Sequence, residues 1–207
     1  MALALSVFAL GLVLSRRSWR SIRSNYRALA ERYGLDLTQP EAKGFGLFQA
    51  SPYLFGVWDR RKTSVQTVTA GLRDSRQAET AIHLETHLRP DCILMIRSKR
   101  GLNRIERSEF RNLSRVGGPG GEFDKRISIA SNRPDWVAER ITAPMCRRIL
   151  EDLGPTAGTI LLVKGRLTYR ETGLLAGARA LDRIERMMVL LKWLAESLED
   201  GPRTGEG

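Results

Sequence analysis

The chain opens with an uncharged, mostly apolar run, Ala2 to Ser15, that arginines follow at once. At ~1.5 Å per residue, a helical run of this length reaches roughly 21 Å, which is short of the ~30 Å hydrocarbon core of a bilayer. No charged side chain precedes the run, and Ser15-Arg16-Arg17 is not a small-x-small cleavage site, so we expect the run to remain uncut. The sequence therefore predicts one short N-terminal transmembrane helix.

The flanking charges predict the orientation of this helix. Arginines after the run favour the cytoplasmic side, so we expect an inner-membrane protein with its N-terminus outside and the bulk of the chain in the cytoplasm. A short span is more stable when it packs against other transmembrane helices. Small residues on one face of the run would allow a partner helix to approach: Ala2, Ser6 and Ala9.

The helical pattern continues past the apolar run and ends at Gly34, a plausible C-cap. Arginines form one stripe of this helix, and aromatic and aliphatic residues form a neighbouring stripe, which is typical of a helix at the headgroup boundary. The residues assigned to the membrane interface are Arg16, Arg17, Trp19, Arg20, Arg23, Tyr26 and Arg27. Alternatively, the aromatic stripe packs on the folded domain.

Positive charge is concentrated in two stretches of a chain with a formal net charge of +11. Residues 1–40 hold six basic and two acidic residues, and residues 97–115 hold seven and two. Local positive patches indicate a fixed anionic surface, either lipid headgroups or nucleic acid, although a solvated basic face has the same composition. The second patch comprises Arg97, Lys99, Arg100, Arg104, Arg107, Arg111 and Arg115.

The remaining chain predicts an α+β fold, with a mainly antiparallel sheet of about eight strands and two to three C-terminal helices. Short β-prone runs, divided by turn residues, carry the sheet: 44–50, 53–59, 62–70, 79–88, 91–97, 122–131, 158–164 and 166–171. The predicted organisation is an anchor and basic juxtamembrane helix at 1–34, a cytoplasmic domain at 35–200 with a basic excursion at 97–121, and a disordered tail at 201–207.

The last predicted helix, from about residue 178 to 199, carries a broader apolar stripe than one packing seam needs. Such a stripe is usually core, but the surplus also suits a docking face for a partner protein. On the second interpretation, Leu191 and Trp193 would join the N-terminal small residues as partner-docking positions.

No motif in the sequence indicates a reaction or a cofactor. Cys92 and Cys146 are too few for a disulfide framework and suit reduced core thiols. His83, Glu85 and His87 alternate along a predicted strand, but the two histidines would lie about 13 Å apart, too far to share a metal ion. The glycine cluster at 117–121 lacks a following Lys-Ser or Lys-Thr, so we expect a connector there rather than a phosphate loop.

Several short motifs resemble a family of uncharacterised bacterial membrane-anchored proteins with a cytoplasmic α+β domain. In that family a tryptophan, a Leu-Ala pair and a Gly-Leu pair follow the apolar N-terminus, as Trp19, Leu29-Ala30 and Gly34-Leu35 do here. The other matching positions are Leu54 to Arg60, Phe123-Asp124, Pro144, Arg147-Arg148 and Ile149-Leu150. The resemblance implies an architecture and no activity.

These features favour a non-enzymatic accessory or scaffold subunit of a larger membrane complex, either energy-transducing (photosynthetic or respiratory) or transport-related. Anionic lipids and integral membrane subunits are the expected partners. Two alternatives stay open from the sequence: a peripheral binder of anionic lipid or nucleic acid that uses the basic patches, and a membrane-anchored enzyme with an unrecognised site.

Overall fold

The computed structural model describes residues 2–39, 51–70, 77–101 and 112–200, and the side chains of the first helix from Ser18 onward. In the described part the fold is α+β, as the sequence predicts, with a nine-stranded antiparallel sheet in the order β1-β2-β3-β4-β9-β8-β5-β7-β6. The predicted strand over 44–50 lies outside the described residues.

The elements have the following bounds. The strands are β1 (Asp36–Thr38), β2 (Tyr53–Trp58), β3 (Arg61–Ala70), β4 (Gln77–Glu85), β5 (Leu94–Ser98), β6 (Ser114–Val116), β7 (Ile127–Ser131), β8 (Thr159–Val163) and β9 (Arg166–Thr172). The helices are α1 (Ala2–Tyr33), the 3₁₀ turn η1 (Lys99–Gly101), α3 (Gly121–Arg126), α4 (Pro134–Arg140), α5 (Ala143–Asp152) and α6 (Ala178–Asp200).

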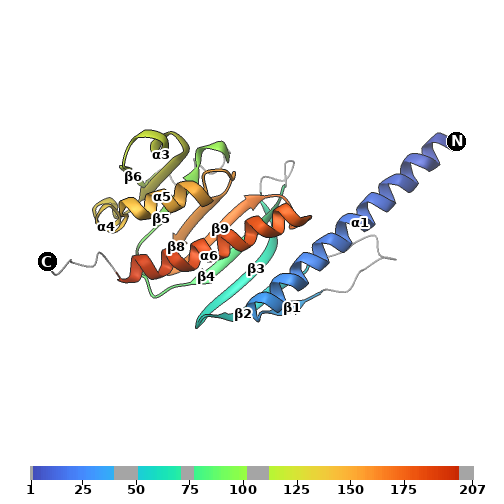
Figure 1. Ribbon diagram of the computed structural model, residues 1–207, viewed down its shortest axis with the longest axis horizontal. Coiled ribbons are helices and arrows are strands. Elements are labelled where there is room, and N and C mark those ends of the chain that lie inside the picture. Colours follow the sequence, from blue (N-terminus) through green and yellow to red (C-terminus); the bar gives the residue numbers. More distant parts are fainter. Residues whose placement is uncertain (1, 40–50, 71–76, 102–111, 201–207) are drawn as a thin grey trace.

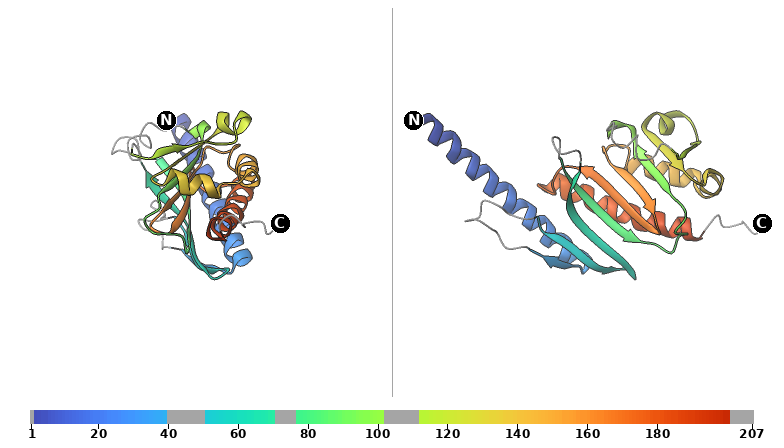
Figure 2. Two further views of the ribbon diagram at one scale, coloured as in Figure 1. Left: turned by 90° about the vertical axis from the view of Figure 1, so that its left-hand side faces the viewer. Right: turned by 180° about the vertical axis from the view of Figure 1, so that it is seen from behind.

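The helices of the described part pack on one face of the sheet (Figures 1 and 2). Phe123 of α3, Val137 of α4 and Ile149 of α5 belong to the same buried cluster as Leu191 of α6. Side chains alternate along the strands, so that Leu54 of β2 is fully buried while its neighbours Tyr53 and Phe55 are about two-fifths exposed. The second face of the sheet at β2 therefore carries exposed apolar side chains.

Helix α1 has two parts with different surroundings. Its first half projects away from the sheet, whereas its second half lies against β1, β2 and α6 (Figure 1). Ile22, Tyr26 and Leu29 have relative exposures of 1%, 0% and 0%. The packed body therefore includes residues that the sequence had assigned to the anchor. Among the described residues, no helix has both the length and the apolar character needed to cross a bilayer.

One predicted strand is wrong in its first half. Residues 122–126, expected to extend β7, form α3 instead. The helix has Glu122 and Asp124 in its first turn and Arg126 one turn after Glu122, 3.7 Å away, an arrangement that suits a helix dipole and an i,i+4 pair. Phe123 is its one buried side chain. A single apolar residue does not set a strand register, so local helical contacts determine the structure here.

Candidate functional site

The β2–β3 hairpin ends in a tight turn that presents charged side chains. Asp59 and Arg60 both have positive φ angles, 49° and 64°, as a two-residue type I′ turn requires. Asparagine or glycine usually occupies such positions, and a left-handed arginine costs about 1 kcal/mol. The strands on either side are in register from Tyr53–Gln66 to Trp58–Arg61. The hairpin therefore holds these two residues in place despite the strained turn.

Two ion pairs bind this hairpin tip to the C-terminal half of α6. Lys192 Nζ lies 2.6 Å from Asp59 Oδ2, and Arg61 donates through both Nη atoms to the carboxylate of Glu199, at 2.8 and 2.7 Å. Glu199 also accepts a hydrogen bond from the backbone amide of His87, at 2.7 Å. Bidentate charge-assisted pairs have strict geometry, so they fix the tip relative to the helix.

The charges of these groups shift one another's pKa values. The hydrogen bond and the charge of Lys192 hold the pKa of Asp59 below its usual value. Burial alone would raise the pKa of Glu199, but the hydrogen bonds from Arg61 and the His87 amide outweigh it and the pKa is lowered. Both carboxylates are therefore ionised near neutral pH, and the salt bridges are intact there.

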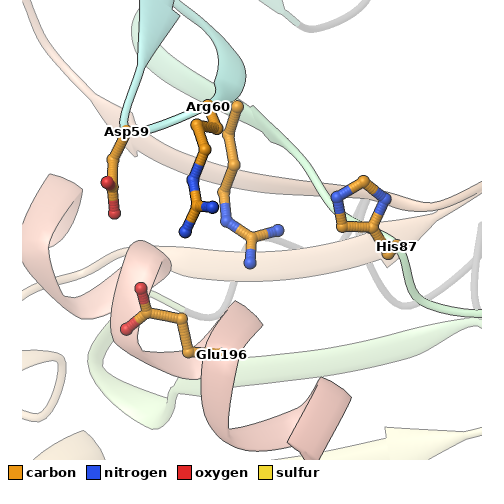
Figure 3. A pocket seen from close by; sticks show the side chains of 5 residues that line it. Asp59, Arg60, His87 and Glu196 are labelled. Atoms are coloured by element: carbon orange, nitrogen blue, oxygen red, sulfur yellow. The ribbon is translucent and has the colours of Figure 1, made fainter.

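A cavity of about 300 Å³ lies between the hairpin tip and α6, lined by Asp59, Arg60, Arg61, His87 and Glu196. Figure 3 shows Arg60 and His87 reaching toward this space from the sheet side, with Glu196 on the helix below. Lys192 approaches Glu196 to 3.7 Å as well as Asp59. The lining thus has cations and anions in near balance, and this arrangement binds the hairpin to the helix rather than selecting a charged ligand.

A second cavity, of about 370 Å³, lies on the other side of the hairpin. Its apolar part is formed by Phe55 and Val57, which are 44% and 62% exposed, and the Tyr53 and Phe55 rings lie 5.8 Å apart. Its polar rim has two cations that share one carboxylate. That rim comprises Lys62, Glu85 and Arg166, with Glu85 oxygens 3.5 and 4.0 Å from the two cationic groups.

The floor of this second cavity includes His83, whose ring nitrogens both have partners. Nε2 lies 3.0 Å from the Gln66 amide nitrogen, and Nδ1 lies 3.0 Å from Thr168 Oγ1. An amide nitrogen only donates, so Nε2 accepts and Nδ1 carries the proton. Burial, with Arg166 and Arg170 nearby, lowers the pKa of His83. Ser64 is its cross-strand neighbour, but an imidazole engaged on both nitrogens is not positioned as its general base.

His83 and His87, the pair rejected above as ligands of one metal ion because of their spacing, line different cavities. His83 is on β4, whereas His87 follows the strand and lines the cavity on the opposite face. In the described ranges, no group of three or more histidine, cysteine, aspartate or glutamate side chains is placed to hold a metal ion.

The structure divides the predicted membrane-interface residues into two groups. Arg20, Arg23 and Arg27 are exposed, and Trp19 is half-buried against the core. Tyr26 does not lie at an interface: it is fully buried, with its hydroxyl 3.3 Å from Thr67 Oγ1. The reason is that the aromatic stripe packs on the body, as the alternative interpretation expected. The side chains of Arg16 and Arg17 lie outside the described part.

The predicted basic patch is not one surface within the described residues. Arg97 has a relative exposure of 9% because β5 is an interior strand between β7 and β8. Lys99 donates to the Asp124 carbonyl, and Arg100 and Arg115 are exposed. The remaining members, Arg104, Arg107 and Arg111, are outside the described residues.

The predicted docking positions on α6 are also accounted for by packing. Leu191 is fully buried because α6 lies over the middle of the sheet, so this residue is core and not a docking surface. Trp193 is half-buried, with the Arg148 guanidinium 4.6 Å from its ring centroid. The side chains of Ala2, Ser6 and Ala9 are not among those described.

The sequence interpretation missed both cavities. It marked Arg60-Arg61 only as a break between strands, although charged residues in place of glycine at a hairpin turn were a signal. It also did not distinguish the exposed Phe55 and Val57 from the buried Leu54 within the same apolar run.

No protein-family model and no curated protein matches this chain. Among solved structures, the crystal structure of the mycobacterial trehalose monomycolate transport factor A, TtfA, is similar, with a TM-score of 0.57 and 12% sequence identity. The likeness covers 90% of this chain and 99% of that one. It shows the fold, and the resemblance to uncharacterised membrane-anchored proteins stays a prediction.

Proposed function

We propose that this protein is a non-enzymatic accessory subunit of a membrane assembly, tethered by the first half of α1 and docked through its folded body. The observation that carries the proposal is the division of α1. One face of its second half is buried in the core, while the uncharged stretch Ala2–Ser15 belongs to the half that projects beyond the body (Figure 1). A folded domain gains nothing from such an apolar extension in water, whereas a membrane stabilises it.

The charges next to this extension suit a cytoplasmic headgroup region. Arg16 and Arg17 follow the apolar stretch directly, and Arg20 and Arg27 are exposed one and three turns later. Each basic side chain near an anionic leaflet contributes about 1 kcal/mol. These contributions offset the shortness of the stretch, which we propose is further stabilised by helices of the partner assembly. The orientation is N-terminus outward with the body on the inner side of the inner membrane.

The exposed side of β2 is the surface that we propose contacts the partner subunit. Tyr53, Phe55 and Val57 form an apolar row, and aromatic residues are common at the centres of protein interfaces. The rim has an excess of positive charge because Lys62 and Arg166 share the single carboxylate of Glu85. The complementary partner is an apolar surface bordered by acidic side chains on the cytoplasmic side of an integral membrane protein.

The comparison with TtfA supports a transport assembly over an energy-transducing one. That protein is a transport factor, and the fold is shared over nearly its whole length. For the present chain this is a proposal, since the similarity is one of fold.

A photo-crosslinking experiment tests the docking proposal. A photoreactive phenylalanine replaces Phe55 in the full chain, and a matched variant carries it at Val189, which is 43% exposed on α6. We expect one discrete adduct with an integral membrane protein from position 55 and none from position 189. Equal, diffuse labelling from both positions would contradict docking through β2. Loss of the adduct from position 55 when residues 2–17 are deleted would show that docking requires the tether.

A further inference from the structure

The loop between β9 and α6 is joined to α1 at the point where the helix leaves the body. Ser21 Oγ accepts a hydrogen bond of 2.9 Å from the Gly177 amide. The Asn25 side-chain amide donates to the carbonyls of Leu175 and Gly177, at 3.2 and 3.0 Å. Asn25 is itself buried, at 8% exposure, so these bonds are shielded from water. The loop therefore has a fixed position along the axis of α1.

This position corresponds to a depth in the membrane if the projecting half of α1 is inserted. Ser21 follows Arg17 by four residues, and a helix rises ~1.5 Å per residue, so the loop attachment lies roughly 6 Å below Arg17. The headgroup layer of one leaflet is about 5–8 Å thick. A body anchored at Arg16 and Arg17 consequently holds the loop at the level of the headgroups.

The side chains on this loop are suited to that environment. Leu174 is 36% exposed although its neighbour Leu175 is buried at 1%. The Ala176 amide donates a short hydrogen bond of 2.7 Å to the Leu174 carbonyl, which closes a tight turn over residues 174–176. Glycines with positive φ, Gly173 at 115° and Gly177 at 81°, bound the segment. One leucine is thus held outside the core on a fixed turn.

Two exposed arginines lie near the ends of this loop, one in the following helix and one on α1 next to the serine that binds Gly177. Arg179 is exposed in the first turn of α6, two residues after the loop, and Arg20 is exposed on α1 next to Ser21. In the described part of the chain, neither has an ion-pair partner among the salt bridges that the structure shows. A guanidinium group binds lipid phosphate in bidentate geometry, and an exposed leucine beside it is stabilised by the acyl boundary.

We propose that the β9–α6 loop, Gly173–Gly177, is a second membrane contact. Leu174 enters the acyl boundary, and Arg179 binds the phosphate of an anionic lipid. The inference rests on the proposed tether and adds that the loop contacts the bilayer beside the helix, which restricts how the body tilts about α1.

An environment-sensitive fluorophore on the loop tests this contact. The full chain carries Leu174→Cys labelled with a nitrobenzoxadiazole dye, and a matched control carries Val57→Cys, which is on the exposed side of β2. The native Cys92 and Cys146 are buried, and burial raises the pKa of both thiols, so mild labelling at neutral pH selects the introduced cysteine. The proteins are reconstituted into vesicles of phosphatidylcholine alone or with phosphatidylglycerol.

We expect a blue-shifted emission at position 174 that a lipid-borne spin label quenches several-fold more than the emission at position 57. Arg179→Gln should reduce this quenching in vesicles with phosphatidylglycerol and leave it unchanged in phosphatidylcholine alone. Protein that floats with the vesicles but shows equal, weak quenching at both positions would overturn the loop contact and leave the tether intact. Protein that does not float would overturn the tether itself. If quenching at position 174 is the same with and without phosphatidylglycerol, and the same with and without Arg179→Gln, the assignment of an anionic lipid is wrong.

Discussion

Deletion of residues 2–17 should leave the folded body stable, whereas deletion of residues 2–30 should destabilise it strongly. The shorter deletion removes only the projecting half of α1, and the longer one also removes Ile22, Tyr26 and Leu29, which are all at 1% exposure or less. Burial of an aliphatic or aromatic side chain of this size contributes about 1.5–3 kcal/mol, so the three together contribute roughly 5–9 kcal/mol. A domain of ordinary stability has about 5–15 kcal/mol in total, so the longer deletion removes most of it.

Urea denaturation followed by circular dichroism measures the difference. The chain without residues 2–17 should unfold in one cooperative transition, and the chain without residues 2–30 should lack a transition or aggregate. Leu29→Ala provides a graded comparison, with an expected loss of about 2–5 kcal/mol, while the exposed neighbour Arg27→Ala should change stability by less than about 0.5 kcal/mol. Equal midpoints for the two deletions would refute the assignment of the second half of α1 to the core.

Three further predictions concern the sheet. Gly158→Ala should cost about 1–3 kcal/mol in urea denaturation, because the new Cβ would lie 2.3 Å from Cε2 of the fully buried Tyr169 ring, whereas Gly117→Ala, with nothing within 4 Å, should be nearly neutral. Arg60→Gly should raise stability by about 0.5–1 kcal/mol by relieving the left-handed turn, and an unchanged or lower urea midpoint would contradict the strain argument. Because folding lowers the pKa of His83, its contribution to the free energy of unfolding is complete above the unfolded-state pKa near 6.5 and is lost as the pH falls toward the lower pKa of the folded state. His83→Gln should therefore flatten the dependence of stability on pH in this range. An NMR titration of His83 with a midpoint above 6.5 would refute the lowered pKa.

The sheet and the fold class were predictable because apolar and polar side chains alternate along a strand with a period of two, and this pattern can be read from neighbouring residues in the sequence. The β8–β9 hairpin illustrates this: apolar runs flank Lys164-Gly165, whose φ angles of 51° and 71° suit the tight turn that glycine favours. Tyr26 shows the limit of such patterns. Helical periodicity placed it in an aromatic stripe, but periodicity does not distinguish lipid from the folded body as the environment of that stripe.

The charged contacts of the site were not predictable from local patterns. Arg61 and Glu199 are 138 residues apart in the chain, and their pairing depends on the fold that brings the hairpin tip to α6. The assignment of Arg97 to an exposed basic patch is wrong for a related reason. The residue lies in a basic stretch of the sequence, but its position on an interior strand buries it. Sequence composition reports a local excess of charge and not which of these charges reach the surface.

Partition after an alkaline carbonate wash tests the tether most directly. Cells produce either the full chain or the chain lacking residues 2–17, and the urea experiment described above checks that the shortened chain is folded. We predict that the full chain stays in the washed membrane pellet and that the shortened chain moves to the supernatant as a folded protein. A full chain released into the supernatant, or a shortened chain retained in the pellet, would contradict attachment through the first half of α1.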